Sequence, residues 1–234
     1  MTSDPRLKSF SDGDALADAL AVSVADRLTA ACRDHGEAVI AVSGGSTPAR
    51  FFRRLSEKDV PWSKVTVTLV DERFVAPDSD RSNQKLVSDT LLQNRAAQAG
   101  FVGLYNPAAD IAAGAKAAAE AIGRIRRPFD VVILGMGNDG HTASFFPGGD
   151  RLADAIAADQ QAPVLPMQAS GAEEPRLTLT LPLIVSAGLV VLHIEGDGKM
   201  TTLDRALGEG RTEEMPIRAV LRHEPVNLEI FWAP

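Results

Sequence analysis

A histidine follows a glycine-rich turn in the segment GMGNDGHTASFFP, residues 135–147. An imidazole exchanges a proton near neutral pH, so His141 is suited to act as a general base or general acid. Asp139 lies two residues earlier and is close enough in sequence to orient that ring. One histidine alone is as compatible with a structural role as with catalysis. The segment therefore predicts a proton-transfer site if other reactive groups gather around His141.

The glycines of this segment also fit the spacing of a dinucleotide-binding loop, G-x-G-x-x-G, at Gly135, Gly137 and Gly140. That loop requires a long helix directly after its third glycine and an acidic residue about 20 residues further on, at the end of the next strand. Here Pro147 and two further glycines follow soon after Gly140, which argues against a long helix. We therefore interpret the glycines as a tight loop that presents His141.

A second glycine-containing loop, SGGSTP at residues 43–48, follows the apolar run 38–42. Its glycines let the backbone approach a ligand, Ser46 or Thr47 can cap the following helix, and proline suits the first helical turn. Exposed N–H groups at such a helix start favour an anion, most plausibly a phosphate, although a plain tight turn is the alternative. The lysine of a Walker loop is absent. The candidate binding residues are Ser43, Gly44, Gly45, Ser46 and Thr47.

Further charged residues lie next to other apolar runs. Asp71-Glu72-Arg73 follows the run 65–70, and charged groups at the end of a buried strand need solvent, partners or a ligand. A carboxylate there can orient a proton and an arginine can bind a phosphate, whereas a surface salt-bridge cluster is the alternative. Lys199 and Arg176 offer further cations near strands. We interpret His193, inside an apolar strand, as a core histidine with its hydrogen bonds satisfied.

The elements around these residues alternate between strands and helices. We expect a helix from Ser11 to Gly36, with Ser11 and Asp14 as its capping box, and further helices over 48–55, 83–92, 108–125 and 199–207. We expect strands over 38–42, 65–70, 101–104, 129–134, 163–166, 177–181, 189–194 and 227–232. The pattern predicts one α/β domain over residues 1–234, with a doubly wound, mostly parallel sheet and helices on both faces. Ligands of such sheets bind at the carboxyl ends of the strands.

Composition narrows the possible partners. The net charge is −7 and no basic run occurs, which argues against nucleic acid and anionic membranes. A single cysteine, Cys32, excludes an internal disulfide and favours a reducing compartment, and the polar N-terminal residues 1–10 do not resemble a signal peptide. We expect a cytoplasmic protein. The scattered histidines predict no zinc site.

Five segments together carry a family resemblance. They are SGGSTP at 43–48, DER at 71–73 with SN at 82–83, GMGNDGHTASFFP at 135–147, PRLTLTLP at 175–182 and GDGK at 196–199. This ordered set resembles the 6-phosphogluconolactonase family. The resemblance implies a sugar-phosphate isomerase-like α/β fold and the hydrolysis of 6-phospho-D-glucono-1,5-lactone to 6-phosphogluconate, in the pentose phosphate pathway, without metal or organic cofactor.

The resemblance also assigns roles to residues. The catalytic residues would be His141, Asp71 and Arg73. Substrate would be bound by Ser43, Gly44, Gly45, Ser46, Thr47, Asp139, Gly140, Arg176 and Lys199. Either Asp71 or Asp139 would orient His141, and we favour Asp71 for contact with the reacting end of the substrate. The family often has a small polar residue near Glu195, where a carboxylate would oppose a bound phosphate, so no binding role is assigned there.

Two other functions fit parts of this pattern. Glucosamine-6-phosphate deaminases share the fold and an Asp-Gly-His sequence, but they place a glutamate a few residues beyond that histidine. Residues 142–149 contain no acid, and Arg73 stands where the deaminases have an aromatic residue. A non-catalytic sugar-phosphate sensor would need no acid–base pair. The sequence therefore favours the lactonase.

Overall fold

The computed structural model describes residue 4 and residues 6–234 of the chain. Residues 1–3 and 5 lie outside the described residues. They belong to the segment 1–10, which we expected not to be a signal peptide. Among the described residues, no helix combines the length and the apolar character needed to span a membrane.

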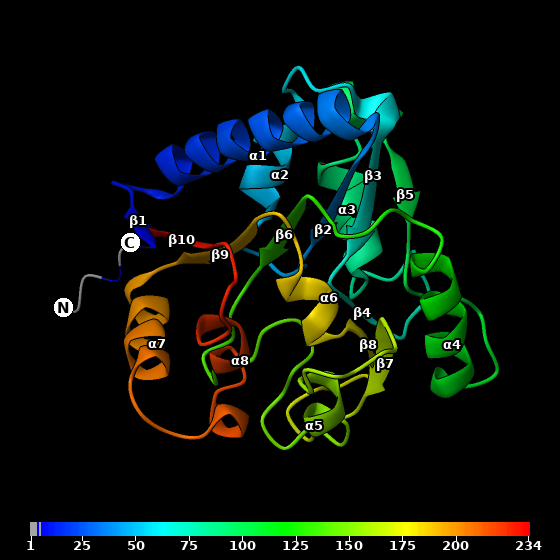
Figure 1. Ribbon diagram of the computed structural model, residues 1–234, viewed down its shortest axis with the longest axis vertical. Helices are drawn as coiled ribbons and strands as arrows, with labels where there is room; N and C mark the ends of the chain where they lie inside the picture. The colour runs from blue at the N-terminus through cyan, green and yellow to red at the C-terminus, as the bar shows by residue number, and fades with distance from the viewer. Residues whose placement is uncertain (1–3, 5) are drawn as a thin grey trace.

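A seven-stranded parallel sheet forms the centre of the structure (Figure 1). Its strands, in spatial order, are β1 (Leu7–Ser9), β10 (Leu228–Ala233), β9 (Val190–Glu195), β6 (Val131–Leu134), β2 (Ala38–Val42), β3 (Val65–Leu69) and β5 (Gly100–Val102). The inner strands are almost wholly buried because helices cover both faces, which explains their continuous apolar runs. Only β1 was not expected, since three residues leave no detectable pattern.

The direction of the chain through the sheet reverses between β2 and β6. From β2 the chain moves outward to β3 and β5, and from β6 it moves outward the other way to β9 and β10. The connections that leave β2 and β6 therefore diverge, and a crevice opens at their carboxyl ends. Residues 43–48 and 135–141 are these two connections. The topology thus brings the two glycine-rich loops together.

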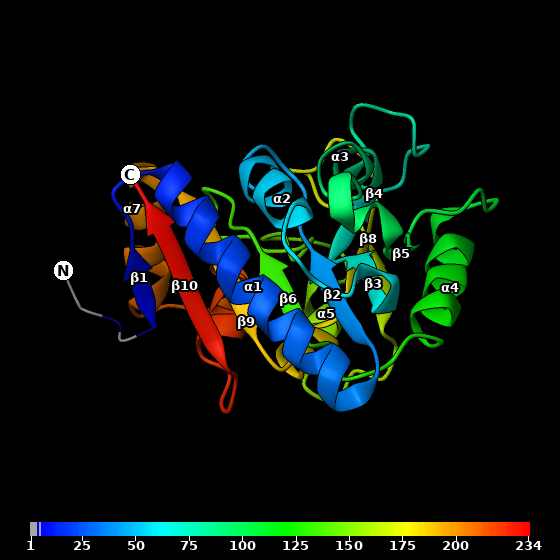
Figure 2. The ribbon, with the colours of Figure 1, turned by 90° about the horizontal axis from the view of Figure 1, so that it is seen from above.

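Helices cover the two faces as a doubly wound fold requires. Helices α1 (Gly13–His35) and α2 (Ala49–Ser56) lie on one face, and α2 also contacts α3 (Asn83–Thr90) (Figure 2). The other face carries α6 (Leu181–Val185), α7 (Asp197–Leu207) and α8 (Arg218–Leu221) (Figure 1). The remaining helices are α4 (Ile111–Ile122), α5 (Leu152–Ala155) and the 3₁₀ turns Trp62–Lys64, Asn94–Gln98 and Thr212–Glu214. The expected fold class is confirmed.

A second, three-stranded antiparallel sheet was not predicted. It contains β4 (Asp71–Arg73), β8 (Arg176–Leu179) and β7 (Val164–Met167), and α4 packs against it. The three charged residues expected at the end of the strand 65–70 thus form a strand of their own. Sequence could not show this because β4 has no apolar alternation and depends on pairing with β8, about a hundred residues later. The pairing rigidly positions Asp71 and Arg73.

The start of α1 differs from the expected capping box. Asp12, not Ser11, is the N-cap, and its side chain accepts a hydrogen bond from the Ala15 N–H at 2.8 Å. The Ser11 hydroxyl donates to Asp12 instead. The end of α1 is as expected, because Gly36 has a left-handed φ of 84° and its N–H donates to the Cys32 carbonyl.

We predict that Asp12→Ala destabilises the protein more than Ser11→Ala. The first change leaves an N–H of the first turn of α1 without an acceptor, whereas the second removes no bond to the helix backbone. Urea denaturation followed by circular dichroism measures the effect as a lower midpoint for Asp12→Ala. A larger loss in Ser11→Ala would contradict the observed cap.

Candidate functional site

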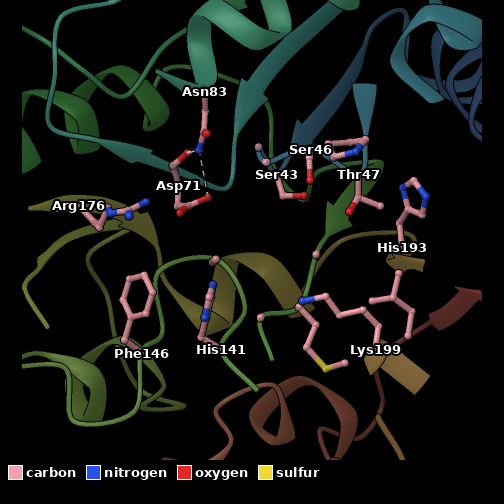
Figure 3. A pocket seen from close by; sticks show the side chains of 18 of the residues that line it. Ser43, Ser46, Thr47, Asp71, Asn83, His141, Phe146, Arg176, His193 and Lys199 are labelled. Atoms are coloured by element: carbon pink, nitrogen blue, oxygen red, sulfur yellow. Dashed lines mark hydrogen bonds between the residues drawn. The ribbon is translucent and has the colours of Figure 1, made fainter. Parts of the chain in front are cut away.

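A cavity of about 360 Å³ opens at the carboxyl ends of β2, β6 and β9, as the topology requires (Figure 3). It is lined by Ser43, Gly44, Gly45, Ser46, Thr47, Pro48, Asp71, Arg73, Asn83, Gly135, Met136, Gly137, His141, Ala143, Phe146, Gly171, Arg176, His193, Ile194 and Lys199. Every residue predicted for the site lines this cavity except Asp139 and Gly140. These two residues directly precede His141 in the same loop.

The imidazole of His141 is held by Asp139. Its Nδ1 lies 2.6 Å from Asp139 Oδ1, and its backbone N–H donates to the same oxygen at 3.1 Å. Burial alone would raise the pKa of Asp139, but the hydrogen bonds and charge of His141 outweigh burial and hold that pKa below its ordinary value. An ionised Asp139 accepts a hydrogen bond from Nδ1–H, which leaves the lone pair of the neutral ring on Nε2. The geometry therefore provides an oriented base at the cavity wall.

Two glycines make this arrangement possible. A Cβ atom on Gly137 would lie 2.2 Å from His141 Nδ1, so only glycine lets the ring lie against the backbone there. Gly140 has a left-handed φ of 81°, and its carbonyl accepts a hydrogen bond from the Ile217 N–H at 2.8 Å. No long helix follows, since the next one is the four-residue α5. The glycine spacing thus serves the histidine loop.

Asp71 is buried and bonds to other partners than His141. Its Oδ2 accepts a 2.6 Å hydrogen bond from the Ser144 hydroxyl, and its backbone carbonyl accepts one from Asn83 Nδ2 at 2.8 Å. Between the two carboxylates considered for orienting His141, the structure places Asp139 in contact with the ring. Asp71 faces the cavity from β4 (Figure 3).

The buried carboxylate of Glu72 joins β4 to the start of α3 next to Asp71. It is fully buried and accepts four hydrogen bonds, from the N–H groups of Arg73, Asn83 and Gln84 and from the Ser82 hydroxyl. Burial raises the pKa of Glu72, and these four donors oppose that rise. The carboxylate therefore fixes the start of α3 against β4, with Asn83 directed at the site.

Two arginines face each other across β4 and β8. Arg73 and Arg176 occupy paired positions of the antiparallel ladder, where like charges destabilise a sheet unless an anion joins them. Arg73 Nη1 donates to Asn83 Oδ1 at 2.7 Å, but its buried Nε has no hydrogen-bond partner in the described part of the chain. The guanidinium of Arg176 lies 5.5 Å from the centre of the Phe146 ring, and burial lowers its pKa. The pair forms a cationic end of the cavity.

The loop 43–48 leads into α2 without a side-chain cap. We expected Ser46 or Thr47 to cap this helix. Pro48 is the N-cap residue instead, and no side chain at this position accepts a hydrogen bond from the N–H groups of the first turn. The two hydroxyl side chains line the cavity instead. A Cβ atom on Gly44 would lie 1.8 Å from Asn83 Oδ1, which explains a glycine at that position. The positive end of the α2 dipole therefore faces the cavity uncapped.

Lys199 reaches the cavity from the first turn of α7. Burial lowers its pKa, and the negative charge of Asp139 opposes this effect. Within the described part of the chain, no carboxylate pairs with Lys199 within 4 Å. A cation near a helix start is unfavourable unless an anion is bound. Lys199 and the start of α2 thus form a second cationic end.

Some cavity residues were missed as individual site candidates. Asn83 and Phe146 appeared only within the family segments, and no local pattern indicates Gly171. His193 was interpreted as a core histidine with its bonds satisfied. It is buried as expected, but its Nδ1 has no hydrogen-bond partner among the described residues, so that interpretation is wrong in this respect. Burial of one polar atom beside a cavity is not visible in sequence.

Sequence comparison identifies close relatives. A profile of the family described as glucosamine-6-phosphate isomerases/6-phosphogluconolactonase matches residues 11–232. The chain is 54% identical to the 6-phosphogluconolactonase of Rhizobium meliloti, over 96% of this chain and 97% of the relative. It is 52% identical to that of Mesorhizobium japonicum, over 97% and 94% of the two chains.

Solved structures of this family are similar to the chain as well. A 6-phosphogluconolactonase from Shewanella baltica superposes with a TM-score of 0.95 at 42% identity and covers 97% of each chain. A monomeric glucosamine-6-phosphate deaminase has a TM-score of 0.76 at 18% identity, over 97% of this chain and 96% of its own. The second likeness concerns the fold alone.

We predict that Glu72→Gln lowers the free energy of unfolding by about 2 to 3 kcal/mol. The glutamine amide supplies one acceptor oxygen where four donors converge, and its NH₂ group faces N–H groups. Urea denaturation measures the loss, with Glu173→Gln on the exposed surface as the matched control. Equal stability of the two variants would show that the buried carboxylate does not hold α3.

Proposed function

The chain belongs to the glucosamine-6-phosphate isomerase/6-phosphogluconolactonase family, and we propose that its cavity hydrolyses 6-phospho-D-glucono-1,5-lactone to 6-phosphogluconate. The observation that carries this proposal is the 2.6 Å contact between His141 and Asp139, with His141 at the wall of a cavity that has cations at both ends. Relatives named 6-phosphogluconolactonase at 41 to 54% identity over most of the chain support the same reaction.

In the proposed mechanism His141 acts first as a base and then as an acid. Its Nε2 takes a proton from water, and the water oxygen attacks the lactone carbonyl carbon. When the tetrahedral intermediate collapses, the bond from that carbon to the ring oxygen breaks, and the imidazolium returns the proton to the leaving oxygen. Asp139 stabilises the imidazolium between these two steps. A lactone is already activated, so no covalent nucleophile is required.

The arginine pair and Asp71 would serve the reacting end. Negative charge develops on the carbonyl oxygen during the attack, passes to the ring oxygen as the intermediate collapses, and returns on the product when the new carboxylic acid loses its proton to solvent. Arg73 and Arg176 are preorganised cations that stabilise such charge without reorganisation. Asp71, fixed by Ser144, would accept a hydrogen bond from a substrate hydroxyl or from the attacking water.

The opposite end would take the phosphate. The uncapped start of α2 and the hydroxyls of Ser46 and Thr47 offer hydrogen-bond donors, and Lys199 adds a charge that no carboxylate of residues 4 and 6–234 pairs with. Helix starts of this kind bind phosphate through N–H groups and the helix dipole. We propose that the substrate spans the cavity, with its phosphate here and its lactone between His141 and the arginines.

Two alternatives receive less support. The deaminase reaction moves a proton between two sugar carbons and needs a further carboxylate beyond the histidine. Residues 142–149 contain none. A non-catalytic sensor would not need the oriented His141–Asp139 pair. Release of ammonia from glucosamine-6-phosphate by the purified protein would restore the deaminase alternative.

We also propose that residues 1–234 act as one cytoplasmic domain without nucleic-acid or membrane partners. Both sheets contribute to one cavity, which supports a single unit. The net charge of −7 supports the absence of polyanionic partners. Equilibrium dialysis against DNA tests the absence of nucleic-acid binding, and size-exclusion chromatography tests whether the chain behaves as one unit.

We predict that His141→Ala lowers kcat for lactone hydrolysis by about 10²- to 10⁴-fold. The variant loses the group that activates water, while the anchors of the substrate remain. Hydrolysis of freshly made lactone is followed above the spontaneous rate, and His35→Ala, exposed at the end of α1, is the control. Full activity of His141→Ala would refute the mechanism, and a wild-type rate equal to the spontaneous rate would refute the function.

We predict that affinity for 6-phosphogluconate falls at alkaline pH. Lys199 is charged below its lowered pKa, so its contribution is lost as pH rises through that pKa, earlier than for an ordinary lysine. Lys199→Arg keeps its charge and should extend binding to higher pH. Calorimetric titration between about pH 7 and 10 measures this. A parallel decline in both proteins would contradict a role for the Lys199 charge.

A further inference from the structure

His193 lies at the wall of the cavity and has a buried ring nitrogen that no described residue bonds to. The side chain projects from β9 and is 1% exposed, and its ring lies against Phe51 of α2 with centroids 6.1 Å apart. The residue lines the cavity together with Thr47, as Figure 3 shows. Nδ1 nevertheless has no hydrogen-bond partner among the described residues. An unpaired buried polar atom costs stability and requires an explanation.

The other ring nitrogen is firmly placed. Nε2 lies 3.2 Å from Glu195 Oε1, and Glu195 Oε2 lies 3.5 Å from Nη1 of Arg50 on α2. The hydrogen bond from His193 lowers the pKa of Glu195, although burial opposes this. An ionised Glu195 requires the proton on Nε2. In the neutral ring, Nδ1 is then an acceptor to which no residue that the structure describes donates.

The same hydrogen bonds explain why the carboxylate of Glu195 does not repel a phosphate in the cavity. A carboxylate at this position would oppose a phosphate bound nearby, but Glu195 does not line the cavity. Its charge is directed at Arg50 and His193 instead. The charged groups around His193 are Glu195 on β9, Arg50 on α2 with Asp14 of α1 behind it, and Lys199 on α7. They place one imidazole between a fixed carboxylate and the phosphate end of the cavity.

We propose that His193 is a phosphate-binding residue that takes up a proton when the ligand binds. Nδ1–H then donates a hydrogen bond to a phosphate oxygen, directly or through the Thr47 hydroxyl, while Nε2–H keeps its hydrogen bond to Glu195. Each anion gains a charged donor, and the unpaired nitrogen gains a partner. Binding of a phosphorylated ligand is therefore coupled to protonation, and its affinity falls as pH rises. The identity of the sugar rests on the proposed function, whereas the phosphate contact does not.

Nuclear magnetic resonance of the wild-type protein tests the protonation directly. The chain has only four histidines, so the ¹⁵N signals of His193 can be assigned by their absence in a His193→Gln variant. We expect inorganic phosphate to move the Nδ1 signal from the imine region to the N–H region. An Nδ1 signal that stays in the imine region at saturating phosphate overturns the proposal, including the case in which a water occupies the site.

Calorimetry provides the matched test of function. In two buffers of different ionisation enthalpy, wild-type protein should bind 6-phosphogluconate with proton uptake, and His193→Gln should lose the uptake and about tenfold in affinity. Affinity for gluconate, which lacks the phosphate, should not change. His35→Gln is the control. Unchanged affinity and proton uptake in His193→Gln overturn the proposal.

Kinetics separates this role from a structural one. His193→Gln should raise KM for the phosphorylated lactone about tenfold with little change in kcat, because the reacting end is untouched. Should His193→Gln fail to fold, Glu195→Gln is the second variant. It weakens the hold on Nε2–H and should reduce proton uptake. Since phosphate binding is measured without turnover, a protein that binds phosphate in this way but leaves the lactone intact refutes the function and not the role of His193.

Discussion

The hydrogen bond between His141 and Asp139 is the constraint on which the site depends. It fixes the proton on Nδ1 and leaves Nε2 as the base, so the chemistry follows from one 2.6 Å contact. Gly137 gives the ring its space, and Gly140 turns the backbone so that carboxylate and imidazole meet. The loop is held from outside as well, because the Ile217 N–H binds the Gly140 carbonyl. The reversal of chain direction at β2 and β6 then places this loop opposite the loop at 43–48.

Charge is distributed unevenly in an acidic protein. The chain carries a net charge of −7, yet cations from β4, β8 and α7 and the positive end of the α2 dipole converge on one cavity. The nearby acids are each committed: Glu72 to the start of α3, Asp71 to Ser144, and Glu195 to Arg50 and His193. Among the described residues, Arg73 and Lys199 have no carboxylate within 4 Å, whereas Arg176 pairs with Glu174 at 3.7 Å, so the field inside the cavity is set mainly by Arg73 and Lys199. Such preorganised charge favours a phosphorylated, acid-forming substrate.

Sequence alone predicted the elements that carry an apolar period, because burial on both faces leaves a continuous apolar run. Apart from β1, the strands of the parallel sheet and α1 were predicted with nearly correct ends. It missed β4, whose three charged residues acquire a strand geometry only by pairing with β8, and it chose Ser11 over Asp12, since both residue types cap helices equally well. Most of the cavity was predictable because strand ends converge. The choice of Asp139 over Asp71, and the lack of a partner for His193 Nδ1 among the described residues, depend on distances of a few ångströms, which spacing along the chain does not encode.

The most direct test of the account is a double-mutant cycle on kcat for lactone hydrolysis with Asp139→Asn and His141→Ala. If Asp139 acts only by orienting and stabilising His141, the single change at Asp139 slows turnover, and the double variant is no slower than His141→Ala alone. If Asp139→Asn turns over at the wild-type rate, or if the two losses multiply in the double variant, the pair does not act as one unit and the account is contradicted.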